Sequence, residues 1–285
     1  MPPHSDSQAN RPEHAGWILV LIGLAAGLVG SFFGLGGGVV FVPLITFLLR
    51  RPIHQATVTS LATMQFLALF GIASYEVQAH IHGEEIVRWD LVWLFAPAAV
   101  LGSSLVGIPL GRRLKGRTLR YVFAILLFFV AAKMVGWVEI GDPAPGEEWP
   151  VWATGPCGAL VGTASGLLGV GGGFLSVPML VLGFQVQQHH AHATSLVVVL
   201  ASAVAGTLRA QHGADPEKKP DWPLALRIAP GAIIGAVCGP VLATALAGDA
   251  LRMAFAGLLV IVALRMLGVG QWISGAIEAR RERRT

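Results

Sequence analysis

Two glycine-rich stretches contain the residues of this sequence that are best suited to chemistry. They read Gly34-Leu-Gly-Gly-Gly38 and Gly169-Val-Gly-Gly-Gly173, and each lies in a long segment without charge. Glycine adopts positive φ and lets a ligand approach the backbone, and the free N–H groups at a helix start bind anions without a basic side chain. We therefore predict that each stretch ends one short helix, begins another and offers backbone amides to an anion. The expected binding residues are Gly34, Gly36, Gly37, Gly38, Gly169, Gly171, Gly172 and Gly173.

Close packing is the alternative role for both stretches, because small residues also let membrane helices approach each other. Val-Pro follows each stretch, and we expect Pro43 and Pro178 to support the helix break. The occurrence of the motif twice favours binding over packing alone.

Two hydroxyl pairs are the second candidate for binding. Thr59-Ser60 and Thr194-Ser195 open the apolar segment that follows each glycine stretch. They supply hydrogen-bond donors and acceptors without a charge, so we expect them to line the same cavity. Capping or bonding within their own helix is the alternative.

The histidines do not predict a metal site. His189, His190 and His192 come without a neighbouring carboxylate or cysteine, and we interpret them as loop residues near the membrane surface. The glycine stretches lack the lysine of a phosphate-binding loop. Cys157 and Cys238 lie in apolar runs and are expected to be buried free thiols. We predict no metal, no cofactor and no enzymatic activity.

The composition indicates a membrane protein with several crossings. Of 285 residues, 54% are apolar and 13% are charged, whereas a soluble domain carries about 25% charged residues. No Asp, Glu, Lys or Arg occurs from Trp149 to Leu208, and a bilayer core needs about 20 apolar residues per helix. The net charge of +4 comes with basic clusters beside apolar segments, which predicts orientation signals and not nucleic-acid binding.

The two stretches belong to an internal duplication. At an offset of 135 residues, Thr59-Ser60-Leu61 matches Thr194-Ser195-Leu196. The match continues at an offset of 133, where Ala96-Pro97 meets Ala229-Pro230. Each half has one glycine-broken segment and three cleaner ones, predicted at 17–49, 55–79, 91–111 and 119–137, and at 150–182, 193–210, 224–247 and 252–270.

Charged loops predict how the two halves lie in the membrane. Loop 112–120 and the C-terminal tail are rich in arginine, and linker 139–150 is acidic. Both basic regions face the cytoplasm only if each broken segment enters and leaves on one side, as a re-entrant hairpin or a pair of short helices. We therefore predict an all-α polytopic membrane protein of two inverted repeats, each with three further full transmembrane helices. The expected parts are a polar N-terminal tail (1–16), a first repeat (17–138), an acidic external linker (139–150), a second repeat (151–270) and a basic tail (271–285), with both termini cytoplasmic.

The doubled glycine motif, followed by Val-Pro and later by Thr-Ser-Leu, resembles the TauE/SafE family of membrane permeases over residues 17–270. The resemblance implies a protein of the bacterial inner membrane that moves small sulfur-containing anions such as sulfite and organosulfonates. It carries over to the glycines, the two prolines and the two Thr-Ser pairs.

We therefore predict a secondary transporter that exports a small sulfur anion with alternating access. The anion would lie at the membrane midplane between the inverted repeats, held by backbone amides of the two glycine stretches. The other expected partners are the lipid bilayer and a coupling proton or ion. An anion channel on the same scaffold is the first alternative, and a membrane enzyme that uses the histidines with a metal is the second. The sequence leaves the identity of the anion and the oligomeric state open.

Overall fold

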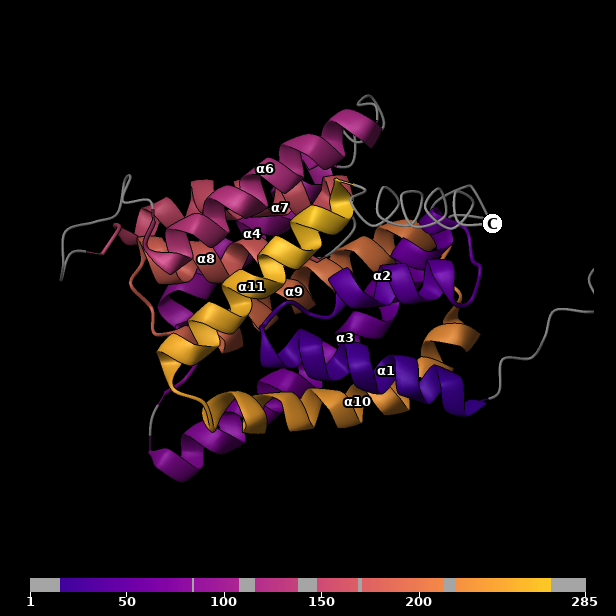
Figure 1. The fold of residues 1–285 in the computed structure, drawn as a ribbon, viewed down its shortest axis with the longest axis horizontal. Helices are drawn as coiled ribbons and strands as arrows, with labels where there is room; N and C mark the ends of the chain where they lie inside the picture. Colours follow the sequence, from indigo (N-terminus) through magenta and orange to yellow (C-terminus); the bar gives the residue numbers. More distant parts are fainter. Residues whose placement is uncertain are drawn as a thin grey trace, which may run out of the picture.

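The computed structural model describes residues 16–83, 85–107, 116–137, 148–168, 171–212 and 219–267, and these ranges are helical with no β-strand (Figure 1). The first half contains α1 (Gly16–Phe32), α2 (Gly38–Phe47), α3 (Ile53–His82), α4 (Trp89–Leu101), the π-helix η1 (Gly102–Gly107) and α6 (Gly116–Val135). The second half contains the 3-10 turn η2 (Val151–Ala153), α7 (Thr154–Leu168), α8 (Gly173–Gly183), α9 (Gln188–Gln211), α10 (Trp222–Thr244) and α11 (Gly248–Met266). The predicted all-α class is confirmed.

Both glycine stretches interrupt a helix, as predicted. The first turn, residues 33–37, separates α1 from α2, and the second turn, described at residues 171–172, separates α7 from α8. Positive φ values of 64°, 72°, 78°, 84° and 86° occur at Gly34, Gly36, Gly37, Gly171 and Gly172. Side chains are strained at such angles, so both turns depend on glycine. Gly169 lies outside the described residues.

The two prolines lie inside the second helix of each pair and not in the turn. Pro43 belongs to α2, and Pro178 belongs to α8. A proline in a helix interior removes one backbone hydrogen bond, so each ring weakens a helix that is already short. That Pro43 and Pro178 support the helix breaks stays a prediction.

Each helix pair forms a hairpin whose two open ends lie together. In the second hairpin, the Trp149 N–H group before α7 donates a 3.0 Å hydrogen bond to the carbonyl of Gly183, which ends α8. In the first hairpin, α1 runs beside α10, and Asp221 at the start of α10 forms a 3.1 Å ion pair with Arg51, which follows α2. Figure 1 shows the open end of the first hairpin on the right and that of the second on the left.

The first helix of each hairpin packs on a long helix of the other half. α1 lies against α10, and α7 lies against α4 and η1. Repeat-related glycines make both contacts, because a Cβ atom at Gly27 would meet the backbone of Ala232 and one at Gly162 would meet the backbone of Ala99. The close-packing role of glycine, which we considered for the turns, therefore applies to these helical glycines.

Four helices of the described chain are long and apolar enough to cross a membrane. They cover Gln55–Ile81, Trp89–Gly107, Gln188–Gln211 and Trp222–Thr244, and α1 and α8 are shorter apolar helices. The segments predicted at 119–137 and 252–270 form α6 and α11, which pack on each other. That these two also cross the membrane stays a prediction.

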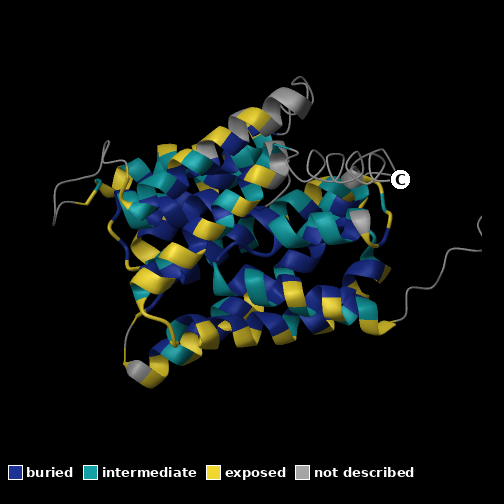
Figure 2. Ribbon diagram, in the orientation of Figure 1, coloured by how far each residue is buried: buried dark blue, intermediate teal, exposed yellow. Residues whose placement is uncertain are grey.

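Large apolar side chains cover much of the outer surface of the bundle. Trp93, Leu105, Ile125, Ile234 and Ile261 are all more than half exposed. Figure 2 shows the buried residues where helices meet and the exposed residues on the outer faces of α10, α6 and α11. An apolar exterior of this kind is suited to lipid.

Gly162→Ala tests the close packing of α7 on α4. Alanine stabilises an ordinary helix by about 1 kcal/mol relative to glycine, but here its Cβ atom meets the Ala99 backbone. Overpacking should reverse the sign and lower the stability by at least about 1 kcal/mol, seen as a lower unfolding temperature in detergent. Gly257→Ala in α11 is the control, because no atom lies within 4 Å of a Cβ atom there. Equal unfolding temperatures of the two variants would contradict this packing.

Candidate functional site

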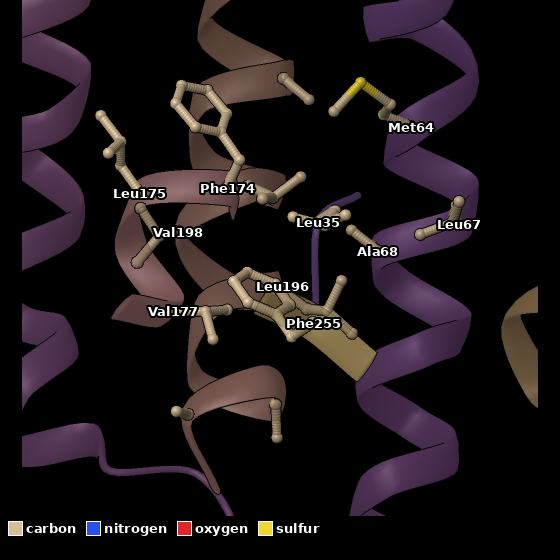
Figure 3. Packing of buried hydrophobic residues seen from close by; sticks show 14 of the residues in the cluster. Leu35, Met64, Leu67, Ala68, Phe174, Leu175, Val177, Leu196, Val198 and Phe255 are labelled. Atoms are coloured by element: carbon tan, nitrogen blue, oxygen red, sulfur yellow. The ribbon is translucent and has the colours of Figure 1, made fainter. Parts of the chain in front are cut away.

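The two glycine turns contact each other inside the bundle. A Cβ atom at Gly173 would lie 2.5 Å from the Gly34 carbonyl oxygen and 2.6 Å from the Leu35 Cα atom. The Leu35 side chain is buried, and Figure 3 shows it between Met64 on α3 and Phe174 on α8. The structure therefore brings together the two stretches that the sequence predicts to share a site.

Met64 and Val199 close this junction with apolar side chains. They occupy equivalent positions of the repeat, 135 residues apart, on α3 and α9. Both are fully buried, and a Cβ atom at Gly36 or at Gly171 would meet atoms of both side chains. The junction is thus tightly packed, with the two turns on either side of one apolar contact.

Two helices begin at the junction. Gly37 is the N-cap of α2 and Gly172 is the N-cap of α8, and neither start has a side-chain cap. The first N–H groups of a helix lack partners within the helix, and the N-terminus carries about half a positive charge. Each of these two helix starts therefore favours negative charge near its first N–H groups.

The serines of the two hydroxyl pairs have different partners. Ser195 Oγ donates a 2.8 Å hydrogen bond to the Gly34 carbonyl oxygen and lies 2.6 Å from Ser176 Oγ. Ser60 Oγ donates instead to the Thr57 carbonyl in its own helix, at 2.8 Å. Ser195 therefore belongs to the junction, whereas the Ser60 hydroxyl makes the within-helix bond that we considered as the alternative.

The threonines of the same pairs hold the starts of helices from the other half. The Asp221 N–H group donates to Thr59 Oγ1 at 3.0 Å, and the Arg88 N–H group donates to Thr194 Oγ1 at 3.1 Å. Asp221 and Arg88 are the N-caps of α10 and α4. These crossed hydrogen bonds repeat the same contact in both halves, so the internal duplication extends to tertiary structure.

His192 is a residue of the junction that the sequence analysis placed wrongly. It lies in α9 and is fully buried, not in a surface loop. Its Nδ1 atom lies 2.9 Å from the Phe32 carbonyl oxygen and its Nε2 atom 2.8 Å from Gln188 Nε2. The spacing of residues 188, 192 and 195 puts them on one helix face. This spacing is the feature of the sequence that could have placed His192 in a helix beside Ser195.

Ionic contacts lie away from the junction. Arg88 bonds Asp90 and Glu148 at the end where the second hairpin opens, and these bonds raise the pKa of its guanidinium. Arg209 in α9 donates to the Ser104 carbonyl at 2.9 Å. These charges fix helix ends and do not reach the glycine turns.

Within the described residues, no group of three His, Cys, Asp or Glu side chains could hold a metal ion. Both cysteines are free thiols, as expected, but Cys238 is exposed on α10 and Cys157 is half-buried. The expectation that both are buried was wrong, because α10 turns this side chain to the lipid-facing surface.

Comparisons with known proteins point to a transport family. The family described as sulfite exporter TauE/SafE matches residues 18–266. A probable membrane transporter protein of Xylella fastidiosa (strain 9a5c) is 29% identical over 230 residues, which cover 79% of this chain and 82% of that protein. The probable membrane transporter protein YunE of Bacillus subtilis (strain 168) is 26% identical over 246 residues, with 78% and 86% covered. No solved structure matches this chain.

Thr59→Val and Thr194→Val test the crossed hydrogen bonds. Each substitution leaves a part-buried N–H group without its partner, which costs about 1–3 kcal/mol. We expect both variants to unfold at lower temperature than the wild type, by similar amounts. Thr63→Val is the matched control, because its hydroxyl bonds the Thr59 carbonyl within α3, and it should change the unfolding temperature little. An equally large drop in the unfolding temperature of Thr63→Val would show that the crossed hydrogen bonds contribute no more stability than a bond within one helix.

Proposed function

The chain belongs to the sulfite exporter TauE/SafE family, and from this premise we propose that it is a secondary transporter that exports a small sulfur-containing anion. Membership of this family makes the chain a membrane transporter. Sulfite as substrate is supported by the family's description, and an organosulfonate is the related anion that the resemblance implies. Export and the binding mechanism below are parts of the same proposal.

The observation that carries the proposal is the contact between the two glycine turns. The start of α8 lies against the first turn, where Gly173 meets Gly34 and Leu35, and α2 begins three residues after Leu35. Backbone amides at two helix starts suit an oxyanion, because they supply several donors without a basic residue that a membrane interior disfavours. Bent backbone at membrane depth is tolerated where it lines such a site.

The proposed binding set contains the residues of both turns, Ser195, which bonds the first turn, and Ser60, which is the repeat equivalent of Ser195. Its members are Gly34, Gly36, Gly37, Gly38, Ser60, Gly169, Gly171, Gly172, Gly173 and Ser195. Thr59 and Thr194 were predicted to bind as well, but their hydroxyls accept from Asp221 and Arg88. We assign these two threonines to positioning the helices around the site.

Alternating access has a natural boundary in this bundle. α1, α3 and α10 pack on one another, and α4 packs on both α7 and α9. The two blocks meet at the α3–α9 interface, which contains Met64 and Val199. Rocking of one block against the other would separate these side chains and open the glycine turns to one side at a time.

The proposed topology places the two hairpins in opposite orientations across the membrane. Arg51 at the open end of the first hairpin lies beside Asp221, and Glu148 at the open end of the second lies beside Arg88. With arginine-rich loops in the cytoplasm, the first hairpin opens inward, the second opens outward, and both termini are cytoplasmic in the bacterial inner membrane.

Cysteine labelling tests the sidedness. Single cysteines are introduced as Arg51→Cys and Gln187→Cys in a background where Cys157 and Cys238 are replaced by serine. A membrane-impermeant maleimide applied to intact cells should label position 187 and should label position 51 only after permeabilisation. Labelling of both positions from one side would overturn the inverted topology.

Flux in proteoliposomes tests the site. Gly37→Val puts a Cβ atom 2.8 Å from Leu67 Cδ1 at a φ of +78°, and Gly172→Val strains the equivalent turn. Each should abolish sulfite or organosulfonate flux while the protein still inserts. Gly257→Ala, which meets open space, should keep wild-type flux.

The same assay separates a carrier from a channel. A carrier gives saturable flux and counterflow of labelled anion against an unlabelled gradient. Flux without counterflow would favour the channel alternative, and wild-type flux in both valine variants would defeat the proposed site.

A further inference from the structure

A pocket of about 630 Å³ opens at the end of the bundle where the second hairpin opens. The turn between α8 and α9 forms one wall, with Gln187, Gln188 and His189, and the start of α11 forms another, with Asp249 and Arg252. No residue of either glycine turn lines it. It is therefore a second candidate site, separate from the junction.

Three polar atoms on the lining residues lack hydrogen-bond partners among the described residues. They are Gln188 Oε1, His189 Nδ1 and Arg252 Nε, and all three atoms are buried. Gln188 itself is only 6% exposed. Buried polar atoms are nearly always bonded in native proteins, so these unbonded donors and acceptors on residues of two pocket walls leave hydrogen-bonding capacity that a ligand could complete.

The hydrogen bonds behind the pocket fix the orientation of Gln188. His192 Nδ1 faces the Phe32 carbonyl oxygen, which only accepts, so Nδ1 carries a proton. Neutral His192 then has an unprotonated Nε2, which accepts from the Gln188 amide NH₂ group at 2.8 Å. This arrangement leaves Gln188 Oε1, an acceptor, on the unbonded side.

Protonation of His192 would reverse that arrangement. A proton taken from water onto Nε2 turns this atom into a donor, so the Gln188 amide must rotate by half a turn to present Oε1 to it. The amide NH₂ group then faces away from His192. No covalent bond changes other than the new N–H bond, and the side chain that offered an acceptor now offers a donor.

We propose that this pocket binds a small oxyanion together with a proton on His192. The rotated Gln188 amide and the Arg252 guanidinium donate to the anion, and the imidazolium supplies a compensating positive charge. The inference concerns equilibrium binding and does not rest on the proposed transport of sulfur anions.

The side chains that contact His192 are mostly uncharged, so few neighbouring charges would compete with it for the proton. Phe32 and Phe33 contact it from the α1 end, Phe255 contacts it from α11, and these are apolar rings or backbone. His189 lies one turn away on α9 and is the other histidine at the pocket, and Asp249 and Arg252 are the charged residues that line it. The first half has Thr57 at the equivalent position, so only one half has this histidine.

Isothermal titration calorimetry with ethanesulfonate tests the proposal. The charge of this anion does not change between pH 5 and 8, so any proton taken up on binding goes to the protein. Titrations in two buffers of different ionisation enthalpy give the number of protons taken up per anion. We expect the number of protons taken up per anion to rise as the pH falls from 7 to 5, and the Kd to weaken by up to about tenfold per pH unit as the pH rises through this range. Binding with no proton uptake, or no binding, would overturn the proposal without any variant.

Variants then locate the linked proton. His192→Gln and Gln188→Leu should abolish the proton uptake, whereas His189→Gln and the control His190→Gln, outside the pocket lining, should keep it. Gly37→Val should also keep it, although it removes flux. Proton uptake that survives His192→Gln, or disappears with Gly37→Val, would show that the linked site lies elsewhere. These outcomes are independent of the flux assay, so either proposal can fail alone.

Discussion

A helix that breaks inside a membrane leaves backbone N–H and C=O groups that lipid cannot bond, so the break must be covered by protein. Here two breaks cover each other: Gly173 lies against Gly34 and Leu35, and Ser195 bonds the Gly34 carbonyl. To meet in this way the hairpins enter from opposite ends of the bundle, and each packs on a long helix of the other half. The helical glycines and the crossed threonine bonds serve that arrangement.

The two halves share a scaffold but differ in polarity around it. Phe41 and Thr57 of the first half stand where the second half has Ser176 and His192. The second half therefore has a buried polar chain beside the turns, with Ser176 and Ser195 bonded to each other and His192 bonded to Gln188 and the Phe32 carbonyl. The two sides of the junction therefore differ in polarity although the scaffold around them repeats.

Much of this fold could be predicted from the sequence, because glycine content, apolar length and an internal repeat report directly on local backbone and burial. The breaks between α1 and α2 and between α7 and α8 are examples. The tertiary partners could not be predicted: nothing local to Thr59 indicates that its hydroxyl bonds Asp221, 162 residues away. His192 was misplaced for a related reason, since a histidine-rich start looks like a loop until the other half covers it.

The central claim is that one anion binds between the two glycine turns. An experimental structure of the protein with bound thiosulfate or an organosulfonate tests it most directly. The account predicts anion density within hydrogen-bond distance of the backbone amides at residues 37–38 and 172–173, with Met64 and Val199 moved apart. Anion density elsewhere, with the turns still packed on each other and these two side chains in contact, would contradict it.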